Sequence, residues 1–211
     1  MGEDHSAGAG FWSGVSHAVR DQGATGLLWV DAHLDGHTPQ TSPNGYVHGM
    51  PLASLLGHGD PGMTGILNDG PKVLPRNVCI LGARSYEEDE RELLERLGVR
   101  IIYMDEVKQA GLDAAFKEAF DIVTRGTIGY GLSFDLHSVD PQDAPGVSTP
   151  ALNGLRWPDL HPYLSQCLRD DRLLAAEIPE FNPSNDIDGK TLQVIEALLF
   201  EGTFAPEACA S

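Results

Sequence analysis

Two short motifs carry carboxylate and imidazole side chains with the spacing of a metal site. Asp31-Ala32-His33-Leu34-Asp35 follows the apolar run Gly26–Val30, and Ser133-Phe134-Asp135-Leu136-His137 ends a second apolar run at 129–134. Side chains two positions apart project to the same side of an extended chain, so the acidic and imidazole groups of each motif can converge. Carboxylates at the ends of buried strands are costly to desolvate unless a cation compensates them, which predicts bound metal, and more readily two ions than one.

The elements that must position these motifs can be predicted from the alternation of apolar runs and helical patterns. Strands are predicted at Gly26–Val30, 78–81, 99–103, 129–134 and 173–176, and helices at 87–97, Leu112–Thr124 and 191–201. This alternation predicts a three-layer α/β/α fold with a mostly parallel sheet covered on both faces. In such sheets, binding groups gather beyond the carboxyl ends of the strands, where both motifs lie. Long loops are predicted at 36–49, 57–75 and 140–158.

Composition bounds the class of protein. A chain of 211 residues without repeats or linkers predicts one domain spanning 1–211. Acidic residues outnumber basic ones by 31 to 14, which argues against nucleic-acid or anionic-membrane partners and suits a cationic substrate. No apolar stretch approaches the roughly 20 residues of a membrane span, and we expect no signal peptide. Three cysteines without metal-type spacing predict a reduced, cytoplasmic protein.

Five motifs, in order, resemble those of the arginase (ureohydrolase) family over nearly the whole chain. They are Gly2-Glu3-Asp4-His5-Ser6, Asp31-Ala32-His33-Leu34-Asp35, His48-Gly49, the segment from Ser133-Phe134-Asp135 to Pro145-Gly146, and Glu180-Phe181-Asn182-Pro183. The stretch His37-Thr38-Pro39, with His48-Gly49-Met50-Pro51-Leu52, looks closer to bacterial arginases than to agmatinases. One such motif is weak evidence, but five in the family's order are specific.

The resemblance implies a pair of Mn²⁺ ions and hydrolysis of L-arginine to L-ornithine and urea. The first ion would be held by His5, Asp31, Asp35 and Asp135, and the second by Asp31, His33, Asp135 and His137. A water bridging the two ions would lose a proton and attack the guanidinium carbon. Glu180 would hold the guanidinium, and His48 would shuttle protons, a role that an imidazole suits. Asp35 joins these two among the residues that we expect to be catalytic.

The resemblance also places residues around the amino-acid end of the substrate. The matching positions are His37, Ser42, Asn44 and Glu87. Ser42 and Asn44 can hydrogen-bond a carboxylate, and Glu87 can meet an α-ammonium. His37 replaces an asparagine common in well-known arginases. The family is commonly trimeric or hexameric, so we expect a homo-oligomer.

Two departures from the family pattern leave alternatives open. Position 137 is histidine where the family has a metal-binding aspartate, which shifts the preference toward Ni²⁺, Co²⁺ or Zn²⁺ and also allows a single-ion or degenerate site. The sequence begins almost inside the first motif, so the fold is expected to lack the family's first strands, with His5 on a fraying end and Glu3 in place of a glycine. The alternatives are a catalytically silent arginase-like protein, or a ureohydrolase for agmatine or another guanidino or formimino compound.

Overall fold

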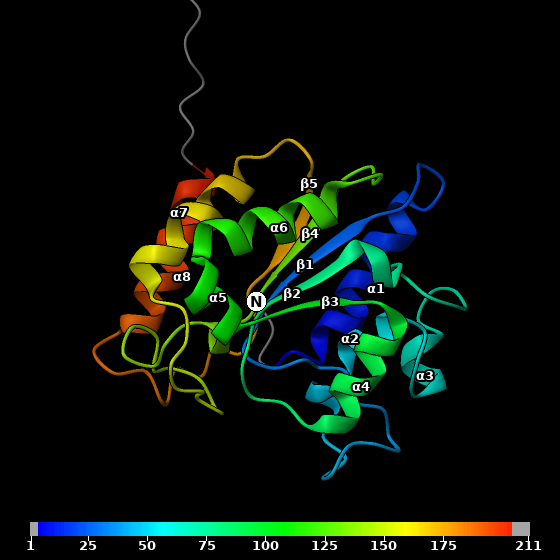
Figure 1. Cartoon of the computed structure of the whole chain (residues 1–211), viewed down its shortest axis with the longest axis horizontal. Coiled ribbons are helices and arrows are strands. Elements are labelled where there is room, and N and C mark those ends of the chain that lie inside the picture. The colour runs from blue at the N-terminus through cyan, green and yellow to red at the C-terminus, as the bar shows by residue number, and fades with distance from the viewer. Residues whose placement is uncertain (1–3, 204–211) are drawn as a thin grey trace, which may run out of the picture.

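A single parallel sheet forms the centre of the molecule (Figure 1). The computed structural model describes residues 4–203, so Gly2, Glu3 and Cys209 lie outside the described residues. The strands are β1 (Gly26–Val30), β2 (Val78–Ala83), β3 (Arg100–Tyr103), β4 (Tyr130–Phe134) and β5 (Leu173–Glu177). Their order is β3-β2-β1-β4-β5. The chain runs outward from β1 to β3 and then returns to the other side of β1, so the order reverses between β1 and β4. Ligand sites of open α/β sheets lie at such a reversal.

Helices cover both faces of the sheet, as the sequence predicts (Figure 1). One face is covered by α1 (Ala7–Val19), α2 (Pro51–Leu55) and α4 (Glu88–Leu97). The other is covered by α5 (Met104–Ala110), α6 (Leu112–Thr124), α7 (Trp157–Leu168) and α8 (Lys190–Thr203). The predicted three-layer α/β fold is therefore confirmed. The predicted loop at 57–75 contains one short helix, α3 (Pro61–Thr64).

The alternation of side chains along β1 explains how a buried strand contacts both layers. Leu28 and Val30 pack with the α5–α8 layer, whereas Leu27 and Trp29 pack with the α1, α2 and α4 layer. Every residue of β1 is buried. A strand that is apolar on both faces belongs in the middle of a parallel sheet, which is where β1 lies.

Helix α1 lies directly against the central strands because one glycine permits it. A Cβ atom at Gly131 of β4 would lie 2.1 Å from the ring of Trp12 on α1. This close packing fixes the segment that precedes the helix, and His5 is only 1% exposed. That His5 lies on a fraying end stays a prediction, although its side chain is buried in the structure. Within residues 4–203, no helix is long and apolar enough to cross a membrane.

Candidate metal centre

The carboxyl ends of β1 and β4 bring the two acidic motifs together. Val30 and Phe134 are register partners, so Asp31 and Asp135 leave the sheet side by side. Each aspartate then accepts a hydrogen bond from the backbone N–H two residues on: Asp31 from His33 at 3.0 Å, and Asp135 from His137 at 2.6 Å. Such Asx turns bend the chain sharply. The aspartate and the histidine of each motif therefore face the same space beyond the sheet.

His5 reaches this space from the start of α1 and faces three carboxylates. Its Nδ1 lies 2.8 Å from Asp35 Oδ2, 2.9 Å from Asp135 Oδ2 and 3.3 Å from Asp31 Oδ2. All four side chains are buried. Yet among the described residues neither His5 Nδ1 nor Asp35 Oδ2 makes a hydrogen bond. Buried polar atoms need a partner, and a bound cation can be the common partner of several that converge. These side chains are therefore a suitable set of donors for a metal ion.

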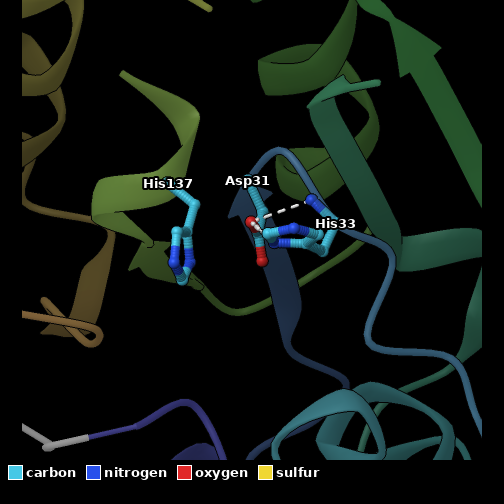
Figure 2. Close-up of side chains that lie close together, drawn as sticks. All are labelled: Asp31, His33 and His137. Carbon is cyan, nitrogen blue, oxygen red and sulfur yellow. Dashed lines mark hydrogen bonds and ion pairs between the residues drawn. The ribbon is translucent and has the colours of Figure 1, made fainter. Parts of the chain in front are cut away.

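A second group of donors lies beside the first. His137 Nδ1 is 2.9 Å from Asp135 Oδ1, and His33 Nδ1 is 3.5 Å from Asp31 Oδ1. The two imidazole rings lie 4.8 Å apart and nearly perpendicular. Figure 2 shows Asp31 and His33 at the end of β1 and His137 across from them. Donor atoms of these three residues lie within 4.8 Å of one another, close enough for one ion. The six ligands predicted from the sequence thus form one cluster.

The protonation of this cluster follows from its negative charge. Burial alone would lower the pKa of His33, but the hydrogen bond and charge of Asp31, with Asp35 and Asp135, raise it to about 9. Burial is likewise outweighed at His5, whose pKa is raised well above the usual value by the same three carboxylates. Burial would raise the pKa of Asp135, yet His137 and His5 lower it. In the metal-free protein, protonated imidazoles therefore compensate the charge of the carboxylates, and metal binding would release these protons.

Supporting residues that the sequence analysis did not assign orient the histidines. His5 Nε2 lies 2.8 Å from Ser133 Oγ, which donates to Glu177 Oε1 at 2.8 Å. Its ring stacks on Trp29 with centroids 4.1 Å apart. His137 Nε2 lies 2.9 Å from Thr149 Oγ1. A signal existed only for Ser133, which stands two residues before Asp135 and so projects to the same side.

Glu180 closes the cluster from a strained backbone position. Its φ is +71°, a left-handed conformation that non-glycine residues rarely adopt. Its Oε1 accepts a 2.7 Å hydrogen bond from the backbone N–H of His5. Burial, with the charge of Asp135, raises the pKa of Glu180 to about 7. This carboxylate therefore lies next to the predicted ligands Asp135 and His137.

A cavity of about 590 Å³ opens from the cluster toward solvent. It is lined by every residue predicted to bind the substrate, namely His37, Ser42, Asn44, Glu87 and Glu180, and by His48, the predicted proton shuttle. His37 Nε2 lies 3.0 Å from Glu87 Oε2, and Ser42 Oγ donates to Asn44 Oδ1 at 3.3 Å. His48 is exposed and lies against Tyr46, with ring centroids 5.4 Å apart.

One buried carboxylate of the cavity was not predicted. Glu90 accepts hydrogen bonds from the backbone N–H groups of Gly36 and Glu87, both at 3.0 Å. Burial raises its pKa to about 8. The residue is 3% exposed and ties the start of α4 to the loop that follows Asp35. In the sequence it reads only as one of several acids on a helix.

Comparison with known proteins gives consistent matches over most of the chain. A sequence model described as the Arginase family matches residues 1–204. An arginase from Brevibacillus brevis is 40% identical over 199 residues, which are 94% of this chain and 66% of the relative. The chain thus spans about two thirds of that relative's length.

Solved structures show the same likeness. The native arginase of Bacillus caldovelox matches with a TM-score of 0.89 and 36% identity, over 98% of this chain and 68% of the other. An arginase from Entamoeba histolytica, solved in complex with L-ornithine, matches with a TM-score of 0.85 and 30% identity, over 94% and 67%.

Proposed function

This chain belongs to the arginase family, and we propose that its site uses divalent metal ions to hydrolyse L-arginine to L-ornithine and urea. The observation that carries the proposal is the set of buried, converging donors around His5 Nδ1 at the inner end of the cavity. The family relatives named above are arginases, and the E. histolytica enzyme holds L-ornithine, the amino-acid product proposed here.

The metal ligands in this proposal are the six that the sequence predicts. His5, Asp31, Asp35 and Asp135 would hold one ion, and Asp31, His33, Asp135 and His137 would hold the other. Mn²⁺ is the ion that the resemblance implies, with Ni²⁺, Co²⁺ or Zn²⁺ as alternatives because position 137 is an imidazole. When bound, such ions supply a water of lowered pKa that can act as the nucleophile.

Glu180 positions the substrate in this mechanism. Its Oε1 is held by the His5 N–H, which leaves Oε2 free to accept from the guanidinium. A cationic partner would hold the carboxyl in its charged form despite burial. The strained backbone at Glu180 keeps the carboxylate against the cluster, so the guanidinium carbon lies near the ligands.

Two further residues handle protons. The carboxylate of Asp35 can accept a proton from the attacking water through the oxygen that does not hold the ion. His48 stands on the short helical turn Val47–Gly49 and is exposed at the cavity wall. An imidazole in that place can pass a proton from solvent to the departing amine of ornithine.

The outer part of the cavity would bind the amino-acid end of arginine. Glu87 would meet the α-ammonium, with His37 beside it, and Ser42 and Asn44 would meet the α-carboxylate. Ser42 already donates its hydroxyl hydrogen bond to Asn44, so this donor is not available to the substrate carboxylate unless the contact between the two residues breaks. This observation favours agmatine, a guanidino compound without that carboxylate, as the second candidate substrate.

The test is urea release by metal-free protein reloaded separately with Mn²⁺, Ni²⁺, Co²⁺ or Zn²⁺. L-arginine and agmatine are compared at equal concentration, and bound metal is measured in every sample. We expect metal-dependent release, faster from arginine. Faster urea release from agmatine would show that agmatine, rather than L-arginine, is the better substrate. If the protein binds its full complement of metal but releases no urea from either compound, it is a catalytically silent arginase-like protein.

A further inference from the structure

Three side chains in the outer part of the cavity lie against one another, and only one of them is open to a ligand. His37 Nε2 lies 3.0 Å from Glu87 Oε2 and 3.6 Å from Glu90 Oε1. The side chains of His37 and Glu90 are 8% and 4% exposed, whereas that of Glu87 is 59% exposed. Glu87 is therefore the member of this group that can meet a molecule in the cavity.

Glu90 uses both of its carboxylate oxygens inside the protein. Its Oε2 accepts from the backbone N–H of Gly36, and its Oε1 accepts from that of Glu87, both at 3.0 Å. A Cβ atom at Gly36 would lie 2.7 Å from Leu94 of α4, so the loop is packed closely on this helix. Glu90 thus ties together the two backbone segments that carry His37 and Glu87.

The ring of His37 is held at both of its nitrogens. Nδ1 lies 3.2 Å from the hydroxyl of Thr41, and Nε2 lies 3.0 Å from Glu87 Oε2. An ionised carboxylate can only accept hydrogen bonds, so Nε2 donates to Glu87 whatever charge the ring carries. The backbone N–H of His37 donates to the carbonyl of Gly49 at 2.9 Å. A buried ring with both nitrogens engaged acts on a ligand through Glu87.

This contact matters because Glu87 is exposed. An exposed glutamate side chain is free to sample several rotamers, and a ligand that immobilises it loses affinity to the entropy of ordering. The hydrogen bond from His37 orients the carboxylate of Glu87 before a ligand binds. An oriented carboxylate in this part of the cavity favours a cationic hydrogen-bond donor, such as a primary ammonium group.

We propose that His37 is a positioning residue for substrate specificity, which holds the Glu87 carboxylate where the ammonium group of a guanidino substrate meets it. The inference rests on the proposed function, in which Glu87 meets the α-ammonium. It adds that selection of the ammonium depends on His37, and that His37 does not select the carboxylate of the substrate.

Three compounds separate recognition of the ammonium from recognition of the carboxylate. L-arginine carries both groups, agmatine carries the ammonium alone, and δ-guanidinovalerate carries the carboxylate alone. In His37→Leu we expect the KM for L-arginine and for agmatine to rise about 10-fold, because Glu87 loses a charge-assisted hydrogen bond. The KM for δ-guanidinovalerate should change less than about 2-fold. His37→Gln, whose amide can donate to Glu87, should restore both raised KM values.

A double-mutant cycle tests whether His37 acts through Glu87. Glu87→Gln should raise the KM for L-arginine and for agmatine about 10-fold or more, and adding His37→Leu to it should raise them no further. The control is Glu88→Gln, which changes an exposed acid that pairs with Arg91 and should alter none of the KM values.

Binding of L-ornithine to the metal-loaded proteins, measured by calorimetry, gives a readout without turnover. Its affinity should fall about 10-fold in His37→Leu and recover in His37→Gln. Bound metal is counted in every variant, because position 37 lies two residues from Asp35.

Four results would overturn the inference. They are an equal rise in KM for all three compounds, no rise for any of them, additive effects of the two substitutions, and a third metal ion that is lost in His37→Leu. The last result would make His37, Glu87 and Glu90 metal ligands, for which their donor atoms lie close enough. Weaker L-ornithine binding in His37→Leu without urea from any compound contradicts only the proposed hydrolysis. Urea release with the same KM values in His37→Leu and the unmodified chain contradicts only the role of His37.

Discussion

The inner and outer ends of the cavity are built in different ways. At the inner end, buried side chains from the segments after β1 and β4 and from the segment before α1 converge, and among the described residues His5 Nδ1 and Asp35 Oδ2 make no hydrogen bond. At the outer end, loop residues hydrogen-bond each other, as half-buried Ser42 and exposed Asn44 do. In the proposed function, residues at the strand ends would hold the metal ions, whereas loop residues would contact the amino-acid end of the substrate. Changes at the inner end should cost far more than changes at the outer end.

The largest effect is expected from Asp135→Asn. Asp135 lies against both His5 and His137, so it belongs to both predicted ligand sets. The substitution removes the negative charge that these two histidines share. Bound metal should fall below two ions per chain, and urea release should fall about 100-fold or more. Metal analysis and a urea assay measure both. The control is Asp105→Asn, which removes an exposed partner of Lys108 and should change neither quantity. An Asp135→Asn protein with full metal content would contradict the assignment.

A slightly smaller effect is expected from Glu180→Gln. The amide keeps the acceptor for the His5 N–H but loses the charge that meets a guanidinium. We expect kcat/KM for arginine to fall roughly 100-fold, or about 3 kcal/mol, with metal content unchanged. Loss of metal from this variant would show that Glu180 is a ligand rather than a substrate contact.

A third prediction concerns the inner end alone, where the stability of the metal-free protein should depend on pH. The folded pKa of His33 is raised from 6.5 to about 9, so protonated His33 stabilises the metal-free fold fully below pH 6.5. This contribution is lost as the pH rises to about 9 and corresponds to about 3 kcal/mol. Urea denaturation of chelator-treated protein measures it. In His33→Asn the decline over that window should be smaller, and equal declines in the two proteins would count against the charged cluster.

The smallest effect is expected at the outer end. Asn44→Ala removes one neutral, exposed hydrogen-bonding group, worth about 1 kcal/mol. The KM for L-arginine should rise roughly 5-fold, with kcat and metal content unchanged. The KM for agmatine, which lacks the carboxylate, should not change. A 100-fold loss of kcat would contradict the division between the two ends.

Local patterns in the sequence predicted all five strands of the described residues but only three of their eight α-helices, α4, α6 and α8. The helix Leu112–Thr124 and the strand Gly26–Val30 have the predicted bounds, because each carries its own periodicity. Helix α1 was not predicted, since its glycines argue against a helix. It forms where Trp12 can lie on Gly131, a contact between residues far apart in sequence. The strained conformation of Glu180 has the same kind of origin and no local signal.

The site divides in the same way. The spacing of the motifs predicted His33, Asp35 and His137 as ligands, because each lies two or four residues from another predicted ligand. Thr149 and Glu177 support histidines that lie elsewhere in the chain, and nothing in their own neighbourhoods marks them. The first set can be predicted from periodicity, and the second requires the packed sheet.

The stacking of Trp29 on His5 gives the molecule an optical reporter. The indole lies 4.1 Å from the imidazole and donates a hydrogen bond to Asp31 Oδ2 at 3.2 Å. A proton or an ion on the imidazole changes the charge beside the aromatic face, to which indole is sensitive. The emission of Trp29 should therefore follow the filling of the cluster in real time, without an added dye.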